Sequence, residues 1–408
     1  MQTRRTITIL IEDDPDLRAT LDAFQSVQQA LSPVCFHDGQ PLCARELHEA
    51  AYYNVKDRVN SQMTCSAIRL VAGAYRSAKS NDRPAHKPFT FARKTALFLI
   101  GSVGRDASFL ADGSLSIWTV AGRKRLNYTI PAFFRDRFDQ ALEFDSLTVV
   151  ERKGRLYGHL AVTLSIPDPK GDQPVGIDRG EINAVTAVDS RDQVFFGSGL
   201  KYKRRNRQTG KQRRRLQERL ACRKAQGKDT HSVRRALKRL SCKQSNRSKD
   251  FCRVSAKRLI DFLPAGSILV MEDLNIPRPL RTKRNRNGEV VQKGNCRGRS
   301  LRRRLSRWTF RRMQGAIVNT AEIMGIPVAY VDAAYTSQIC SHCGQRGVRK
   351  RHLFVCPSGE FMIHADINAP TNIRNRYQAM LQATAVGCKS ITPEARLRGQ
   401  GCLFAGTS

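Results

Sequence analysis

The chain has 408 residues, 40% of them hydrophobic, which is enough for a folded protein of two or three domains. Its 71 Lys and Arg against 35 Asp and Glu give a formal charge of +36, which favours a polyanionic partner such as nucleic acid and disfavours a small-molecule metabolic enzyme. No apolar run is long enough for a membrane span or a signal peptide. Its 12 cysteines favour free thiols or a metal site over a disulfide scaffold.

The first 165 residues predict one strand, then helices, then further strands. Thr6–Glu12 alternates as a strand does, and Asp14-Pro15 opens a helical pattern that reaches Leu31. Two more helical patterns follow, at 45–59 and 66–79. Four strand patterns complete this part, at 89–103, 114–120, 147–150 and 157–166. This order predicts an antiparallel barrel or sheet with helices inserted after its first strand.

Two strongly basic segments follow. In residues 201–263 the few apolar side chains recur at roughly helical intervals, which predicts a helical hairpin with a thin apolar seam. The seam is expected to contain Val233, Leu237, Leu240, Phe251 and Val254. Residues 278–304 are basic and almost free of apolar residues, which predicts a loop. A single basic run usually forms a solvated face, but two of them in a chain of charge +36 predict nucleic-acid contact, which we assign to five residues: Arg213, Arg214, Arg215, Arg234 and Arg235.

Three carboxylates lie at the ends of strand-like or helix-like segments. Val175–Val188 predicts a β-hairpin whose first strand carries Asp178, and an apolar run from Ser267 ends in Glu272 as a buried strand does. Asp366 stands at the start of a helical segment. Each alone is most simply a cap or turn residue. Together, three carboxylates in so basic a chain fit phosphodiester hydrolysis, in which oxygen ligands hold two Mg²⁺ ions about 4 Å apart.

The three segments resemble the split motifs of the RuvC nuclease domain, as found in TnpB proteins and their descendants, the compact type V CRISPR effectors. The resemblance rests on Gly-Ile-Asp178-Arg-Gly, Met-Glu272-Asp-Leu and Asp366-Ile-Asn-Ala-Pro-Thr-Asn-Ile. Trp308 and Phe310 before a helix, and then Tyr335-Thr-Ser-Gln-Ile-Cys-Ser-His-Cys-Gly, complete it. It extends from about Val175 to Arg374, and nothing comparable is found in the first 165 residues.

The resemblance implies an α+β fold. A wedge β-barrel with inserted recognition helices, at about 13–82, would occupy residues 1–165. An RNase H-like (RuvC) α/β nuclease domain would follow in three parts, at 170–200, 264–335 and 363–386. The basic helical hairpin 201–263 and a zinc-ribbon-like segment at 336–362 would separate these parts, and 387–408 would be a disordered tail.

The resemblance also implies an RNA-guided DNA endonuclease that acts in the cytoplasm, at the nucleoid, of a prokaryote. Asp178, Glu272 and Asp366 would hold two Mg²⁺ ions, and guide RNA and target DNA would be the partners. Whether the chain belongs to a transposon or to a CRISPR system stays open, as do its guide, its target-adjacent motif and its oligomeric state. Two other functions are considered: an RNA-guided DNA-binding repressor, in which loss of an acidic residue would be expected, and a basic RNA-binding or ribosome-associated protein.

Cys340, Cys343 and Cys356 form most of a zinc signature. The resemblance implies a fourth cysteine three residues after Cys356, but this chain has Gly359 there. Zinc binding therefore stays open, and so does the identity of a fourth ligand. Five residues elsewhere are alternatives: His342, His352, His364, Cys388 and Cys402.

Overall fold

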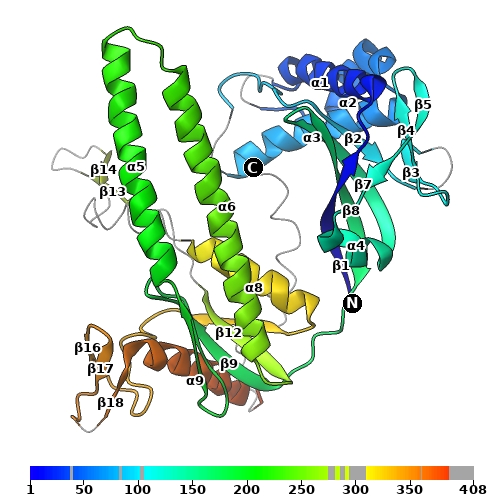
Figure 1. The fold of residues 1–408 in the computed structure, drawn as a ribbon. Coiled ribbons are helices and arrows are strands. Elements are labelled where there is room, and N and C mark those ends of the chain that lie inside the picture. Colours follow the sequence, from blue (N-terminus) through cyan, green and yellow to red (C-terminus); the bar gives the residue numbers. More distant parts are fainter. Residues whose placement is uncertain are drawn as a thin grey trace. The chain divides into compact units, whose positions relative to one another are not determined.

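A computed structural model describes residues 1–36, 40–81, 85–101, 105–273, 281–284, 290–293, 309–359 and 361–385. Contacts divide the chain into two compact units, Met1–Ile166 and Pro167–Ser408 (Figure 1). Every helix within the described ranges is too short or too polar to cross a bilayer. The predicted tail at 387–408 and Trp308 lie outside the described residues.

Unit 1 opens with strand β1 (Gln2–Ile11), and three helices follow it. Asp14 caps the first helix by accepting a hydrogen bond from the backbone N–H of Leu17 at 2.8 Å, and Asn60 caps the third by accepting one from Met63 at 2.7 Å. The helices are α1 (Pro15–Cys35), α2 (Ala44–Val55) with the 3-10 turn η1 (Lys56–Arg58) after it, and α3 (Ser61–Ser80). All three predicted helical patterns are confirmed.

The rest of unit 1 forms two antiparallel sheets and a short helix. The larger sheet has the order β2-β7-β8-β1-β6, and the smaller has the order β3-β4-β5. The elements are β2 (Thr95–Leu99), β3 (Ala107–Phe109), β4 (Leu115–Thr119), β5 (Gly122–Leu126), β6 (Tyr128–Thr129), α4 (Ala132–Asp139), β7 (Ala141–Arg152) and β8 (Arg155–Ser165). The predicted insertion of helices after the first strand is confirmed, and closure into a barrel stays a prediction.

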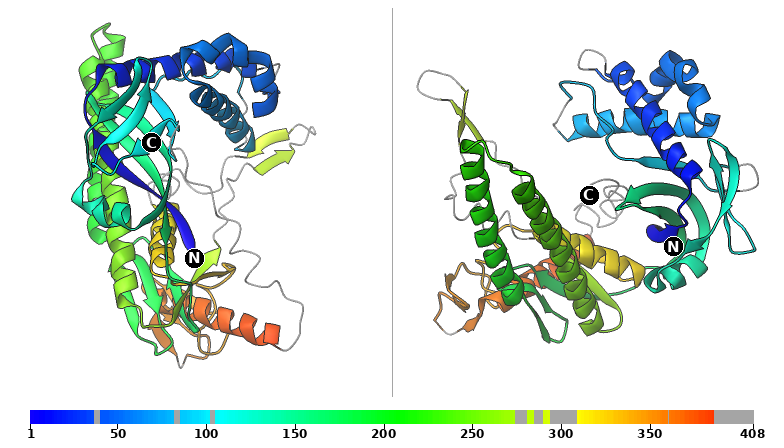
Figure 2. Two further views of the ribbon diagram at one scale, coloured as in Figure 1. Left: turned by 90° about the vertical axis from the view of Figure 1, so that its right-hand side faces the viewer. Right: turned by 45° about the horizontal axis from the view of Figure 1, so that its top comes forward.

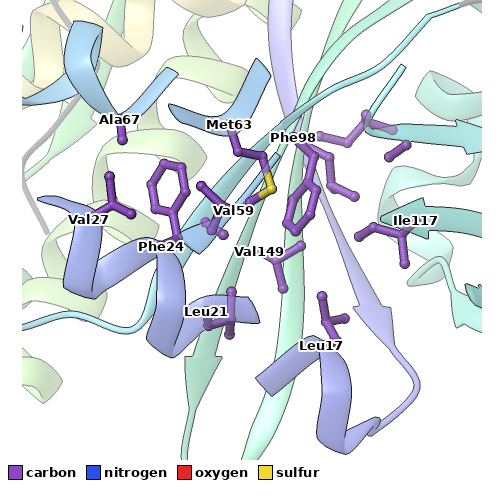
Figure 3. Packing of buried hydrophobic residues seen from close by; sticks show 14 of the residues in the cluster. Leu17, Leu21, Phe24, Val27, Val59, Met63, Ala67, Phe98, Ile117 and Val149 are labelled. Carbon is purple, nitrogen blue, oxygen red and sulfur yellow. The ribbon is translucent and has the colours of Figure 1, made fainter. Parts of the chain in front are cut away.

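One face of α1 forms the core of unit 1 together with the larger sheet (Figure 3). Leu17, Leu21 and Phe24 recur every three to four residues and are fully buried. Phe98 of β2 and Val149 of β7 belong to the same cluster. Burying each such side chain contributes about 1.5–3 kcal/mol, so this stripe fixes the helices to the sheet.

Some elements of unit 1 differ from the prediction. The strand predicted at 89–103 is shorter, because β2 spans only Thr95–Leu99, and the sequence does not predict β3, β5, β6 or α4. These are short elements without a strong local pattern. Their aromatic residues meet only in the folded unit, where the Phe109 ring lies 5.1 Å from Tyr128 and 5.4 Å from Phe138, measured between ring centroids.

Unit 2 contains a five-stranded sheet of mixed direction. Its order is β11-β10-β9-β12-β15, in which β9, β10 and β11 run antiparallel while β12 runs parallel to both β9 and β15. The strands are β9 (Gln173–Asp178), β10 (Asn183–Val188), β11 (Val194–Ser198), β12 (Ser267–Asp273) and β15 (Val328–Asp332). The predicted hairpin at 175–188 and the predicted strand from Ser267 are both confirmed.

Four helices and two small sheets complete the described part of unit 2. The helices are α5 (Leu200–Ala225), α6 (His231–Phe262), α8 (Phe310–Ile323) and α9 (Ala365–Ala385). One small sheet is β16 (Val348–Lys350), β17 (Leu353–Val355) and β18 (Met362–His364). The other is an antiparallel pair, β13 (Arg281–Arg284) and β14 (Val290–Lys293), inside the segment predicted as a loop.

Helices cover both faces of the larger sheet of unit 2. Side chains alternate along a strand, so Leu269 and Met271 of β12 pack with α6 and α8, while Ile268 and Val270 pack with Ile373 of α9. Strand β12 is therefore buried on both sides, which explains its continuous apolar sequence.

The predicted helical hairpin is formed by α5 and α6, seen as two long green helices in Figure 2. Its predicted seam is wrong at one position, because Val254 is 44% exposed. Buried residues of α6 near it include Cys252, Ala256 and Leu259, which face the sheet. Helix α6 packs on both α5 and the sheet, so the spacing of its apolar residues does not show which of them face α5 and which face the sheet.

Candidate functional site

Asp178 and Glu272 lie side by side because their strands are parallel neighbours. The register pairs Ile177 of β9 with Met271 of β12, so the next residue of each strand reaches the same edge of the sheet. Asp178 ends β9, and Glu272 is the penultimate residue of β12. Two carboxylates from distant segments therefore meet at one sheet edge.

Asp366 is brought to the same edge by a close approach of two backbones. A Cβ atom added at Gly176 would lie 1.9 Å from the Pro370 carbonyl oxygen and 2.9 Å from the Arg374 nitrogen, so α9 crosses β9 where only glycine fits. Asp366 lies in the first turn of α9, and the side-chain amide of Asn183 donates a hydrogen bond to its Oδ2 at 2.9 Å.

The electrostatics of Asp178 reflect this convergence. Burial, and after it the charges of Glu272 and Asp366, together raise the pKa of Asp178 to about 6, although a hydrogen bond of 2.7 Å from the Arg179 backbone N–H to Oδ1 acts in the opposite direction. Three carboxylates that repel one another in a shielded site form an oxygen-rich donor set, and this fits a hard divalent cation such as Mg²⁺.

Three side chains that the sequence did not single out hold these carboxylates or their strands. Buried Arg179 donates from Nη1 to Gln314 at 2.6 Å and from Nη2 to the Glu272 backbone oxygen at 3.1 Å. The Thr336 hydroxyl donates to Glu272 Oε1, and Arg349 Nη2 forms an ion pair of 2.8 Å with Asp366 Oδ1. Arg179 and Thr336 stand inside the quoted motifs, whereas no local pattern indicates Arg349.

The three cysteines of the predicted zinc segment form one cluster. The Sγ atoms of Cys340, Cys343 and Cys356 all lie within 4.8 Å of one another, and those of Cys343 and Cys356 are 3.3 Å apart. Ser358 Oγ donates to Cys356 Sγ at 3.2 Å, and hydrogen bonds from Ser358 are the main cause that lowers the pKa of the Cys356 thiol to about 7. Three converging thiols, one of them readily ionised, fit a soft or borderline metal such as zinc.

Within the residues that the structure describes, this cluster has three metal-ligating side chains. Gly359 has a φ of +77°, and a Cβ there would meet no atom within 4 Å. His342 stacks on Phe361, and His352 stacks on His364. Two further alternatives for a fourth ligand lie outside the described residues, Cys388 and Cys402.

The cysteine segment is fastened to the helix that carries Asp366. The Asn368 side chain is fully buried, accepts from the Ser341 backbone N–H at 2.9 Å and donates to the Ile339 oxygen at 2.7 Å. The Ala365 backbone N–H donates to the His352 oxygen at 2.7 Å. The position of Asp366 thus depends on the fold of the cysteine segment as well as on the sheet.

The five arginines assigned to nucleic acid are spread over the hairpin. Arg214, Arg215 and Arg234 are exposed. Arg213 is half-buried and donates to Gln244 on α6 at 2.8 Å, and Arg235 hydrogen-bonds His231 at 2.8 Å. Arg213 therefore joins the two helices, whereas the exposed arginines are available to a ligand.

Two families match parts of the chain. Residues 155–283 match the family described as "Probable transposase", and residues 310–373 match "Cas12f1-like, TNB domain". The TnpB-like protein MJ0751 of Methanocaldococcus jannaschii is 25% identical over 208 residues, which cover 50% of this chain and 68% of that protein. The CRISPR-associated endodeoxyribonuclease Cas12f1 of Sulfoacidibacillus thermotolerans is 39% identical over 72 residues, 17% of this chain and 17% of that protein.

Segments of the chain are thus similar to a TnpB-like protein and to a compact type V effector. Asp178 and Glu272 lie inside the first matched segment, and the cysteine cluster and Asp366 lie inside the second. The predicted resemblance is thereby confirmed.

Solved structures support the same fold class. A Cas12f1–sgRNA–target DNA complex aligns with a TM-score of 0.56 at 14% identity, over 89% of this chain and 81% of that one. The mini-RNA-guided endonuclease CRISPR-Cas phi3 aligns with a TM-score of 0.52 at 10% identity, over 92% of each chain. At such low identity the likeness concerns the fold, which is the mixed α and β fold of these effectors.

Proposed function

We propose that the chain is an RNA-guided DNA endonuclease and that unit 2 is its RNase H-like (RuvC) nuclease domain. The observation that carries this proposal is the convergence of Asp178, Glu272 and Asp366 from three distant segments onto one edge of a mixed sheet. Unit 1 would then be the wedge and recognition part, and guide RNA and target DNA would be the partners. The similar fold of the Cas12f1–sgRNA–target DNA complex supports this assignment.

In this proposal the three carboxylates hold Mg²⁺, which would supply positive charge to the attacking and leaving oxygens of a phosphodiester. The residues around them keep the donor oxygens in place. Arg179 fixes the end of β12 through the Glu272 backbone, and Thr336 orients the Glu272 carboxylate. Asn183 donates to Oδ2 of Asp366, while Arg349 donates to its Oδ1, so both carboxylate oxygens are held.

A repressor without cleavage would need no metal ligands, and a basic RNA-binding protein would need no carboxylates at all. The presence of all three acids favours the nuclease. Purified chain with its copurified RNA, incubated with Mg²⁺ and a plasmid that matches the guide region of that RNA, separates the three functions. Cutting supports the proposal, and binding without cutting supports the repressor. The absence of both cutting and binding supports the RNA-binding protein. Sequencing of the RNA distinguishes a repeat–spacer transcript from a transposon-end transcript.

We further propose that Cys340, Cys343 and Cys356 hold at most one zinc ion, with an open fourth position. Gly359→Cys is expected to make zinc more resistant to a competing chelator, because it supplies a fourth thiolate three residues after Cys356. The gain in zinc-binding free energy is reduced by about 1 kcal/mol, since a side chain at a φ of +77° is strained. Zinc release to a chromogenic chelator measures the effect.

Gly359→Ala is the matched control for this zinc prediction, because it adds the same strain without a thiol. It should release zinc at least as readily as the wild type. Wild-type protein that keeps one zinc per chain under strong chelation would contradict the open position.

The exposed arginines of the hairpin are expected to act through phosphates. Changing Arg214 and Arg234 to glutamine should weaken binding of duplex DNA with little dependence on its sequence. The slope of log affinity against log salt concentration should become shallower by up to about 2, because each phosphate contact contributes about 0.9 to that slope. Fluorescence anisotropy over a range of KCl concentrations measures the slope. An unchanged slope would mean that these side chains contact only solvent.

A further inference from the structure

A groove between α5 and α6 is lined by positive charge. Its first compartment, of about 490 Å³, has Arg205 on α5 and Lys243 and Arg247 on α6 in its walls. A second compartment, of about 460 Å³, continues it toward the turn of the hairpin and shares Gln212, Leu240 and Lys243 with the first. No Asp or Glu is among the residues that line either compartment. Both volumes are in the range of small-ligand sites.

The two compartments lie along one side of the hairpin. The α5 residues Arg205, Gln212 and Arg215 recur at helical intervals, as do Arg239 and Lys243 on α6, so each set lies on one face of its helix. From position 205 to position 215 the groove runs about 15 Å at 1.5 Å per residue. This length suits several consecutive groups of a linear polyanion rather than a single ion.

The groove exists because the seam between the helices is polar at this level. Near the sheet, Tyr202 and Phe251 stack at 4.3 Å between ring centroids and close the seam. Further out, Arg247 Nη1 donates to Thr209 Oγ1 at 3.2 Å. Such bonds join the helices without filling the space between them. Two buried polar atoms of this seam, Asn206 Oδ1 and Ser248 Oγ, have no hydrogen-bond partner among the described residues.

The second compartment differs in chemistry from the first. Leu216 of α5 and Ala236 and Leu240 of α6 form its apolar wall, and Arg215 and Arg239 border it. An apolar wall next to cations suits a flat, partly apolar group that is attached to an anion. An unpaired nucleotide has this composition, because its base has an apolar face and its phosphate carries charge.

We propose that this groove binds an unpaired stretch of single-stranded nucleic acid. Phosphates contact Arg205, Lys243 and Arg247, and one base lies against the apolar wall. The glutamine amides of the first compartment can donate to and accept from base edges or sugar hydroxyls. The groove follows the seam between two neighbouring helices, which favours a single strand over a wider duplex. This inference rests on the proposed function, to which it adds the form of the ligand and its site.

The test uses the full chain freed of copurified RNA and labelled probes of about 12 nucleotides: oligo-U RNA, oligo-dT DNA and a duplex of equal length. The groove variant Arg205→Gln/Lys243→Gln/Arg247→Gln should lose roughly 10–100-fold in affinity for the single strands. Its salt slope should fall by about 2, from about 0.7 for each of three phosphate contacts. Affinity for the duplex should change by less than about 3-fold. The RNA and DNA arms show which strand the groove prefers.

The control variant Arg207→Gln/Lys238→Gln/Lys249→Gln removes the same charge from exposed positions of the hairpin outside the groove. It should bind single strands within about 3-fold of the wild type, because the general charge effect is small beside the lost contacts. Ala236→Leu narrows the apolar compartment without a charge change and should weaken single-strand binding several-fold. It keeps the test decisive if the triple groove variant melts at a lower temperature than the wild type.

The groove proposal would be refuted if the groove and control variants lost equal affinity for the probes, or if the groove variant lost equal affinity for single strands and for the duplex. Plasmid cleavage by the wild type, measured in parallel, tests the proposed function independently of the groove. If the wild type cuts the plasmid and the groove variant binds single strands as well as the wild type does, only the groove proposal is refuted. If the wild type binds no probe and cuts no plasmid, both the groove proposal and the proposed function are refuted.

Discussion

Replacing Asp178, Glu272 or Asp366 by alanine is expected to lower cleavage of a guide-matched plasmid by about 10³-fold or more. Each change removes a proposed metal ligand, which is worth several kcal/mol at about 1.4 kcal/mol per tenfold in rate. Binding of the target should stay within about 3-fold, because it comes from phosphate contacts and base pairing. Gel electrophoresis of the plasmid and anisotropy with a labelled target measure the two quantities, and EDTA should reproduce the cleavage loss in the wild type.

Two matched variants show whether charge at the site or general damage causes the loss. Asp178→Asn keeps the size of the side chain and an acceptor for the Arg179 backbone N–H, so it should fold normally and still fail to cut. Asp261→Ala removes an exposed acid of α6 and should cut at the wild-type rate. Near-normal cutting by any one of the three carboxylate variants would refute the assignment of that residue.

Gly176→Ala is expected to destabilise unit 2 by about 3 kcal/mol and to abolish cleavage. The new Cβ would overlap the Pro370 carbonyl oxygen at 1.9 Å, and both partners are backbone, so no side chain can rotate away. Helix α9 must then shift away from β9, and Asp366 shifts with it. Urea unfolding followed by circular dichroism measures the stability, and the plasmid assay measures the displacement of the carboxylate.

Gly73→Ala is the control for this change. Gly73 lies within α3 of unit 1, and a Cβ there would meet no atom within 4 Å. The substitution should raise stability by up to about 1 kcal/mol, because alanine is the better helix former, and cleavage should be unchanged. If Gly176→Ala behaved like Gly73→Ala, the close approach of α9 to β9 would not hold in solution.

Patterns confined to one segment were the most predictable part of this protein. The hairpin at 175–188 and the central strand before Glu272 could be predicted from their own sequences, because a strand buried on both faces must be apolar throughout. Asp178, Glu272 and Asp366 could be chosen because each ends or begins such a segment. Their convergence could not be derived from spacing, since it depends on strand register and on the crossing of α9 at Gly176.

Features that depend on distant contacts escaped the sequence analysis. Arg349 stands in an exposed hairpin strand, and only folding of the cysteine segment brings it to Asp366. Val254 fits the apolar periodicity of α6, but it is exposed, and the spacing of apolar residues does not show which side of the helix packs on the sheet. The groove between α5 and α6 could not be found either, because the arginines that line it look like the many that do not.

The way the candidate site is assembled has a consequence for the newly made protein. Asn183 and Asp366, which hydrogen-bond each other, are 183 residues apart in the chain, and Glu272 comes from a segment between them. During synthesis, which proceeds at roughly 5–20 residues per second, the first carboxylate leaves the ribosome many seconds before the third. A nascent or prematurely terminated chain that ends before Asp366 thus has the basic hairpin but lacks one of the proposed metal ligands. Under the proposed function, such a chain would have its nucleic-acid surface before its cleavage site, which would give a guide RNA time to bind before the nuclease is complete.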